Sequence, residues 1–356
     1  EHFRQRDGNV RFSFLCHAEN DLALAAVASL GASALPLAEL IDFPRAFAGL
    51  LDEGGFDAVV GIGADVMAGH YHPDIPRQIL IAADLAARKG LPSVITGFSF
   101  NDHARPELAK YFARLAPAVR LNLRDPVSRE RLGRFARVSS RLVADTAFSL
   151  KAGKVGDDVA QWIDRMRGEA RQVIGFNMHP MLFPANGDGA IERAVAAVAA
   201  AMAAESARRP VAWMLVPHDY RRETIGDAGF LRPLEAALRG YDGLMVRYFE
   251  GTHPSATIKA LAGRLDGVVT GRMHLAIAAL GMGVPVMCAA YQGKFAGLLR
   301  HFHLPDALHL DPAVLSNEQE FGTALSCFVD DLANHRTAVV KALPSVSALA
   351  QANLMD

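Results

Sequence analysis

Short runs rich in apolar residues alternate with amphipathic stretches along most of this chain. Runs such as 56–62, 92–96 and 118–123 each end in a polar or glycine-containing loop, and a longer amphipathic stretch follows each loop. Short apolar runs bounded by such loops are typical of strands, and the stretches between them are typical of helices. The alternation therefore predicts an α/β fold with mostly parallel, doubly wound sheets.

The alternation occurs twice. It runs from about residue 10 to residue 143, and it restarts with a strand near residues 173–177. The segment Lys151–Asp158, which contains glycine and several charges, is the best linker candidate. We therefore expect an N-terminal Rossmann-like domain over residues 1–155 and a C-terminal Rossmann-like domain over residues 156–356. Two such domains facing a cleft form a GT-B-like arrangement, and 356 residues suit two domains of ordinary size.

Composition and charge exclude several classes of protein. With 51% hydrophobic and 21% charged residues the chain is globular rather than disordered. Its 37 Lys and Arg balance 38 Asp and Glu, so no overall positive field attracts nucleic acid or anionic lipid, and any anion site is local. No apolar run reaches the length of a membrane span. Cys16, Cys288 and Cys327 lack metal-ligand spacing and are expected to be buried thiols, so a cytoplasmic protein is expected.

Residues 266–295 carry the strongest sign of a site. They predict a strand that ends at Thr270, a turn at Gly271, a helix that opens with Arg272, a second strand and a loop that ends in Lys294. Ligands of open α/β sheets bind at the carboxyl ends of the strands, and a helix N-terminus favours an anion. Arg272, His274 and Lys294 around such an end predict an anion pocket, most plausibly for phosphate.

Loops of the N-terminal half offer further candidates. Asn20 or Asp21 is placed to cap a helix after the first strand, and either residue is also a candidate wall of the site. Asp65 ends a GIGAD loop that follows the next strand. The nearby segment 70–72, which reads His-Tyr-His, raises the question of a metal. Adjacent loop residues seldom converge on one ion, so we expect no metal site.

Two more strands end in charged residues. Arg124 ends one strand directly before Asp125, which is a natural N-cap for the helix that begins with Pro126. In the second half, a strand ends at His218 and Asp219. Asp219 is explained as a helix cap, whereas His218 is expected to face the same edge as His274 and to bind or relay a proton.

At these motifs the chain resembles the polysaccharide pyruvyl transferase family. The resemblance covers about residues 10–310 and rests on the ordered segments RDPVSRERL, ADTAFSL, PHD, TGRMHLAIAALGMGVP and YQGKF. It implies a GT-B-like fold and the transfer of the enolpyruvyl skeleton of phosphoenolpyruvate to a saccharide, which forms a pyruvate ketal. Two loops depart from the family pattern, where this chain has HAENDLA and GIGAD. Both loops would face the acceptor.

The resemblance also implies roles for residues. Arg272 would contact the phosphate or carboxylate of the donor, and His274 would act as general acid. Arg124 and Lys294 would be further anion contacts. His218, Asp65 or Asp21 would be the base, and the sequence does not choose among them. The chemistry requires no metal or cofactor, with phosphoenolpyruvate as the donor substrate.

The resemblance leaves three readings of the function. The first is a pyruvyl transferase of exopolysaccharide biosynthesis with a saccharide or lipid-linked glycan acceptor. Such a protein would be cytoplasmic and could contact the inner face of the plasma membrane, either alone or as a homo-oligomer. The second is a GT-B glycosyltransferase or another enzyme that uses a sugar nucleotide. The third is a non-catalytic glycan-binding relative.

Overall fold

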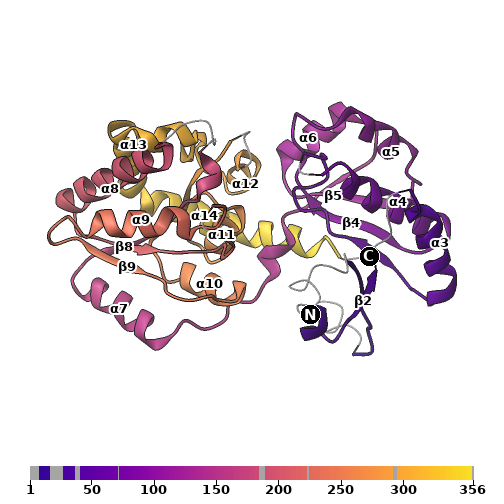
Figure 1. Cartoon of the computed structure of the whole chain (residues 1–356), viewed down its shortest axis with the longest axis horizontal. Coiled ribbons are helices and arrows are strands. Elements are labelled where there is room, and N and C mark those ends of the chain that lie inside the picture. Colours follow the sequence, from indigo (N-terminus) through magenta and orange to yellow (C-terminus); the bar gives the residue numbers. More distant parts are fainter. Residues whose placement is uncertain are drawn as a thin grey trace.

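The computed structural model describes residues 8–16, 27–36, 41–70, 72–183, 189–222, 224–291 and 295–354. Within this part of the chain, one parallel sheet is built from strands that precede residue 143 and another from strands that follow residue 171. The coil at 150–156 joins the two halves, and Figure 1 shows them as two separate bodies of sheet and helix. Both halves therefore have the expected α/β architecture.

The N-terminal half contains two groups of parallel strands. Its described elements are β1 (Ser13–Cys16), β2 (Ser33–Pro36), α3 (Phe43–Gly54), β3 (Val59–Gly61), α4 (Asp74–Arg88), β4 (Ser93–Phe98), η1 (Pro106–Leu108), α5 (Ala109–Arg114), β5 (Val119–Leu123), α6 (Pro126–Phe135), β6 (Arg141–Leu142) and η2 (Thr146–Ser149). In the described residues, β3, β4, β5 and β6 form one sheet in that order, and β1 pairs with β2 alone. Strand β2 is not predicted by the sequence pattern, because it is short and ends in proline.

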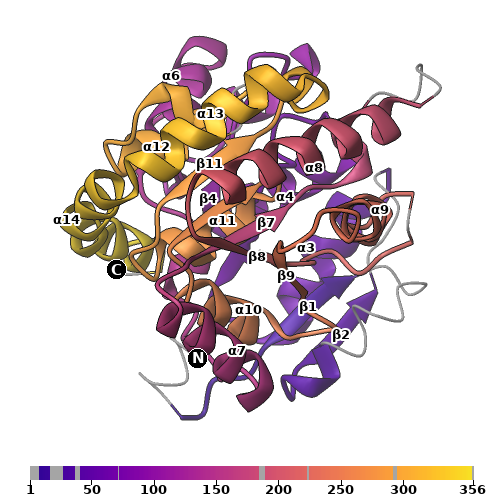
Figure 2. The same cartoon turned by 90° about the vertical axis from the view of Figure 1, so that its left-hand side faces the viewer.

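The C-terminal half contains the larger sheet. Its described elements are α7 (Asp157–Gly168), β7 (Gln172–Asn177), η3 (Pro180–Leu182), α8 (Ala190–Arg208), β8 (Val211–Leu215), α9 (Ala228–Leu238), β9 (Met245–Tyr248), α10 (Ser255–Ala262), β10 (Gly267–Thr270), α11 (Met273–Leu280), β11 (Val286–Ala289), α12 (Ala296–His301), η4 (Asp306–Leu308), β12 (His309–Leu310), η5 (Pro312–Ser316), α13 (Glu318–Asp330) and α14 (Leu332–Gln351). Helix α8 packs beside α9 and α13, and α10 packs beside α11 (Figure 2).

The strand order of this sheet determines where a ligand can bind. The described strands follow the order β9-β8-β7-β10-β11-β12, which is the Rossmann order with β7 and β10 at the centre. The chain winds in one direction from β7 to β9 and in the other from β10 to β12. The carboxyl ends of β7 and β10 therefore border the crevice at the switch point, where ligands of such sheets bind.

Burial explains why these segments form strands. Every residue of β10 and β11 is buried, as expected for central parallel strands with helices on both faces. Helix α7 has buried Val159, Trp162, Ile163 and Met166, at helical spacing. Helix α7 was not predicted, because its first charged residues and the preceding glycine are typical of a linker. The two last helices, α13 and α14, are separated at Asp331.

The last described residues return to the N-terminal half. Asn353 is buried, and its Oδ1 accepts a hydrogen bond from the Gly97 amide at 2.6 Å. Its Nδ2 donates to the Ala144 carbonyl at 2.7 Å. Figure 1 shows α14 passing from the C-terminal half to the N-terminal half. The two halves are therefore joined by the end of the chain as well as by the coil at 150–156.

The cysteines differ in environment. Cys288 lies in β11 and is fully buried, and burial raises the pKa of its thiol well above the usual value. Cys327 is exposed, so the expectation that it is buried is wrong. It occupies a solvent-facing position of α13, because the buried face of that helix carries Phe321, Leu325 and Phe328. The side chain of Cys16 lies outside the described ones.

Candidate active site at the carboxyl edge of the C-terminal sheet

The ends of β7 and β10 are held together by polar contacts. Thr270 Oγ1 donates to Asn177 Oδ1 at 3.0 Å, and the Gly271 amide donates to the Asn177 carbonyl at 3.0 Å. Both side chains are fully buried. This pairing fixes the start of the turn that leads from β10 into α11.

Gly271 is closely packed. A Cβ atom at this position would lie 2.7 Å from Leu182 Cδ1 and 3.1 Å from His179 Cδ2, so a larger residue would require these side chains to shift. His179 Nε2 also lies 3.2 Å from the Gly271 carbonyl oxygen. Glycine therefore lets η3, at the end of β7, pack directly against the turn. Gly271 positions the backbone of the predicted site and supplies no side chain.

Arg272 is held at the edge of the sheet by described contacts of its guanidinium group. Its Nε donates to Asp227 Oδ1 at 2.8 Å, and its Nη2 donates to the Ile225 carbonyl at 2.8 Å. Nη2 also lies 3.1 Å from Asp219 Oδ2. The side chain of Arg272 is 15% exposed. Arg272 therefore holds Asp219, Ile225 and Asp227 together at the sheet edge.

The carboxylate of Asp227 binds Arg272 and three further donors, although the sequence pattern did not predict a role for it. Its carboxylate is fully buried. Oδ2 accepts from Asn177 Nδ2 at 2.7 Å and from the amides of His218 and Asp219 at 2.8 Å and 2.9 Å. Asp227 precedes α9, but its side chain makes no capping bond to that helix. Because Asp227 directly precedes a helix, its position is typical of a capping residue, and the sequence pattern does not indicate its contacts with Arg272 and Asn177.

Asp219 joins Arg272 to a second arginine. Its carboxylate accepts from Arg221 Nε at 2.9 Å and from Arg221 Nη2 at 2.6 Å. The hydrogen bond from Arg221 is the largest cause that lowers the pKa of Asp219 to about 2. Its backbone is fixed on both sides, because the Asp219 carbonyl accepts from the Asp227 amide at 3.0 Å. The predicted capping role of Asp219 is therefore replaced by a bridge between two arginines.

Two histidines lie beside Arg272. Burial is the largest cause that lowers the pKa of His218 to about 4, and His274 and Arg272 lower it further, while Asp227 opposes them. His218 is therefore neutral near pH 7. His274 is exposed and lies in the first turn of α11. The His218 amide and the Arg272 guanidinium both donate to the Asp227 carboxylate, and the effect of His274 and Arg272 on the pKa of His218 shows that the three residues are near one another.

Arg124 lies in the N-terminal half and is buried. Its Nη1 pairs with Asp145 Oδ2 at 2.7 Å, and its Nε donates to Ser99 Oγ at 2.7 Å. His301 of α12 contacts the Arg124 carbonyl at 3.0 Å, so this strand end meets the C-terminal half. Asp125 accepts from the Ser128 amide at 2.7 Å and caps α6 as predicted. The buried ion pair explains why an arginine ends β5 without invoking a ligand.

The remaining predicted site residues are Asp65, Asn20 and Asp21 of the N-terminal half and Lys294 of the C-terminal half. Asp65 is partly buried in the turn after β3. Asn20, Asp21 and Lys294 lie outside the described residues. Within the described ranges, no group of His, Cys, Asp or Glu side chains could hold a metal ion.

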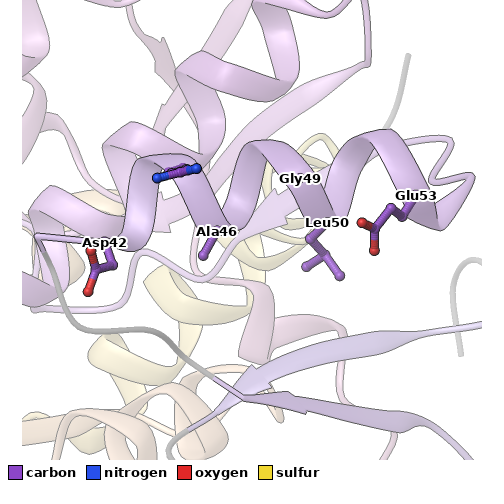
Figure 3. Close-up of a pocket in the computed structure, with 6 residues that line it drawn as sticks. Asp42, Ala46, Gly49, Leu50 and Glu53 are labelled. Carbon is purple, nitrogen blue, oxygen red and sulfur yellow. The ribbon is translucent and has the colours of Figure 1, made fainter.

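A separate hollow lies along one face of α3. It is lined by Asp42, Arg45, Ala46, Gly49, Leu50 and Glu53 (Figure 3). It contains no residue of the Arg272 cluster and belongs to the other half of the chain. We therefore place the candidate site at the sheet edge, where buried charges and histidines converge.

Comparisons with known proteins agree with the sequence motifs. A family model described as polysaccharide pyruvyl transferase matches residues 3–293, which is more than half of the chain. No curated protein gives a significant match. Among the described helices, none combines the length and apolar character that would let it cross a membrane.

Solved structures resemble the chain in fold. A structure from Listeria monocytogenes assigned as a UDP-N-acetylglucosamine 2-epimerase matches with a TM-score of 0.59 and 10% identity, over 92% of this chain and 83% of that chain. A glycosyltransferase from Rickettsia africae matches with a TM-score of 0.54 and 10% identity, over 93% and 86%. Anabaena HepE in complex with UDP and glucose matches with a TM-score of 0.55 and 11% identity, over 98% and 91%. At these identities the likeness concerns the fold alone, and it confirms the predicted GT-B-like arrangement of Rossmann-like domains.

Proposed function

Because the chain belongs to the polysaccharide pyruvyl transferase family, we propose that it transfers the enolpyruvyl skeleton of phosphoenolpyruvate to a pair of saccharide hydroxyl groups. The product is a pyruvate ketal, formed during exopolysaccharide biosynthesis. The observation that best supports this reaction is the position of Arg272 and exposed His274 at the start of α11, beside the switch point of the sheet.

The chemistry needs an acid that protonates carbon and a site that holds an anion. Protonation of C3 of the donor makes C2 electrophilic, so that two acceptor hydroxyls add to C2 while the bond from C2 to the phosphate oxygen breaks. One hydroxyl proton balances the new methyl group, and the other leaves with the phosphate. His274 is exposed and lies in the first turn of a helix, so it is the proposed acid. Arg272 orients the donor through its guanidinium group, with Lys294 as a further anion contact.

The base is proposed to be His218. It is neutral near pH 7, because its pKa is lowered to about 4, and it lies beside His274 and Arg272. A neutral imidazole can accept a hydrogen bond from an acceptor hydroxyl. Asp65 and Asp21 are the remaining candidates for the base, and both belong to the N-terminal half of the chain. The low pKa makes His218 a weak base that orients the hydroxyl before the proton leaves.

We assign the binding of the two substrates to the two halves of the chain. The C-terminal half, from residue 156 onward, would bind the donor, and residues 1–155 would bind the acceptor. A lipid-linked glycan would place the protein at the inner face of the plasma membrane, in the cytoplasm. The reaction would use phosphoenolpyruvate as a substrate and need no further cofactor.

One observation favours a second candidate. The fold is shared with a glycosyltransferase and with a protein crystallised with UDP and glucose. A nucleotide sugar would place its diphosphate near the same helix start. Such an enzyme would not release phosphate from phosphoenolpyruvate, and a non-catalytic relative would bind glycan without turnover.

The test is phosphate release from phosphoenolpyruvate across a panel of saccharides and lipid-linked glycans. We expect release that depends on an acceptor and is lost in His274→Gln. Release of UDP from a UDP sugar, without release of phosphate from phosphoenolpyruvate, would support the second candidate. Glycan binding without either release would identify the non-catalytic relative. His274 is the better control than Arg272, because removal of Arg272 also breaks the contacts that hold the 219–227 loop.

A further inference from the structure

Arg221 and Arg272 share one carboxylate. Asp219 Oδ2 lies 2.6 Å from Arg221 Nη2 and 3.1 Å from Arg272 Nη2. Asp219 Oδ1 accepts from the Arg221 Nε at 2.9 Å and from the Arg221 amide at 3.1 Å. Both oxygens of one planar group are thus bound by the two arginines at the sheet edge.

The carboxylate of Asp219 balances part of the positive charge of Arg221 and Arg272. Arg272 already has a fully buried partner in Asp227, which also anchors three other donors. Asp219 is the second carboxylate on Arg272 and is 14% exposed, and Arg221 is 59% exposed. Removal of the Asp219 carboxylate would leave the arginine pair with one excess positive charge, at an edge that solvent reaches.

Only the side chain of Asp219 would have to move. Its amide donates to Asp227 Oδ2 at 2.9 Å, and its carbonyl accepts from the Asp227 amide at 3.0 Å. These bonds fix the backbone, while rotation of the side chain would release the two arginines. The loop can therefore exchange one carboxylate for another without changing its backbone.

We propose that Arg221 and Arg272 form a carboxylate-binding subsite, which Asp219 fills in this structure and which the carboxylate of the donor fills during the reaction. The assignment of the donor rests on the proposed function. Arg221 thereby becomes a substrate-binding residue. The ligand class is a carboxylic acid, because the two arginines bind the carboxylate of Asp219 in this structure, and guanidinium groups match that group through paired hydrogen bonds.

This arrangement makes Asp219 a competitor of the donor. For a ligand that binds only the released pair, the apparent dissociation constant equals the intrinsic one divided by the fraction of molecules in which the pair is released. If Asp219 fills the subsite in most molecules, its neutralisation tightens binding by roughly tenfold or more. A carboxylic acid without phosphate should show this gain, and inorganic phosphate should show less of it.

The test is calorimetric titration of the full chain with pyruvate and, separately, with inorganic phosphate. Asp219→Asn has nearly the same shape as the original residue and lacks its charge. Arg221→Gln and the double variant Asp219→Asn, Arg221→Gln remove one side of the subsite. The matched control is Asp164→Asn, because Asp164 is an exposed carboxylate of α7 that pairs with Arg264 at 2.5 Å. Thermal unfolding of each variant reports whether it folds.

We expect Asp219→Asn to bind pyruvate roughly tenfold more tightly, and the double variant to lose this gain. Asp164→Asn should bind like the unmodified protein. Unchanged or weaker pyruvate binding by a folded Asp219→Asn variant would overturn the subsite. If Asp219→Asn does not fold, Arg221→Gln decides alone, and pyruvate affinity unchanged by that substitution would overturn the proposal.

The titration separates this inference from the proposed function. Tighter pyruvate binding by Asp219→Asn, without turnover of phosphoenolpyruvate by any form of the protein, would keep the subsite and reject the transferase. Acceptor-dependent turnover with unchanged pyruvate affinity in Asp219→Asn would keep the transferase and reject the subsite.

Discussion

Asp227 and Arg272 form a buried ion pair at the switch point of the C-terminal sheet. Asp227 Oδ1 accepts from Arg272 Nε at 2.8 Å and lies 2.7 Å from Arg272 Nη2. The other carboxylate oxygen accepts from Asn177 on β7 and from the amides of residues 218 and 219. One side chain thus connects the ends of β7, β8 and β10.

Asp227→Asn should destabilise the protein by about 3–5 kcal/mol, because it removes the fully buried charge partner of Arg272 and leaves only Asp219, at 3.1 Å, to balance that arginine. An asparagine also cannot accept on both sides, since one of its oxygens is replaced by an NH₂ group. Urea unfolding of the variant and of Asp242→Asn, an exposed control, measures the difference. Equal stability of the two variants would contradict the central role of Asp227.

His274→Gln should lower turnover by roughly a hundredfold or more, as expected for loss of a general acid. Its stability should hardly change, because His274 is exposed. Steady-state phosphate release and thermal unfolding check both parts, with exposed His103→Gln of the N-terminal half as the control. Wild-type turnover in His274→Gln would remove this residue from the mechanism.

Stability should fall as pH is lowered from about 6.5 towards 4. Burial depresses the folded-state pKa of His218 to about 4 from its usual 6.5, so the unfolded chain binds a proton that the folded chain does not. The contribution of His218 is fully present above pH 6.5 and is lost as pH falls through this window. The slope from one such group is up to about 1.4 kcal/mol per pH unit.

The pH effect is measured by urea unfolding at several pH values for the unmodified protein and His218→Gln. The substitution should flatten the slope between pH 6.5 and 4 but not abolish it. Burial also lowers the pKa values of His301 and His309, which act in the same direction. An identical slope in both proteins would show that His218 titrates normally in the folded state.

Arg124→Met should destabilise the N-terminal half by about 3–5 kcal/mol, because it leaves the Asp145 carboxylate buried without its partner. The double variant Arg124→Met, Asp145→Asn removes both charges, while the asparagine still accepts from the Ala147 amide that Asp145 caps. We expect the double variant to regain most of the stability and to keep turnover within a few-fold. A stable double variant with a hundredfold loss of turnover would instead make Arg124 a substrate contact.

Local patterns were sufficient for most elements of the fold. The strand Gly267–Thr270 ends where it was predicted to end, and the strand Gln172–Asn177 lies within one residue of its predicted place. These segments are recognisable because burial of a strand or helix face imposes a period of apolar residues on the sequence. Strand β2 and helix α7 were missed, since one is too short for a period and the other begins among glycine and acidic residues.

The sequence by itself determined that Arg272 and His274 lie together at the start of a helix that follows a buried strand, because spacing along one element fixes which side chains share an end. It could not identify their partners. Asp227 is 45 residues from Arg272 and 50 from Asn177, and only the strand order brings the three together. The tertiary structure was also needed to determine which of the two arginines, Arg124 or Arg272, is buried. Arg124 and Arg272 each lie just after a strand, yet Arg124 is buried in an ion pair with Asp145, whereas Arg272 is 15% exposed and lies beside the exposed side chain of His274.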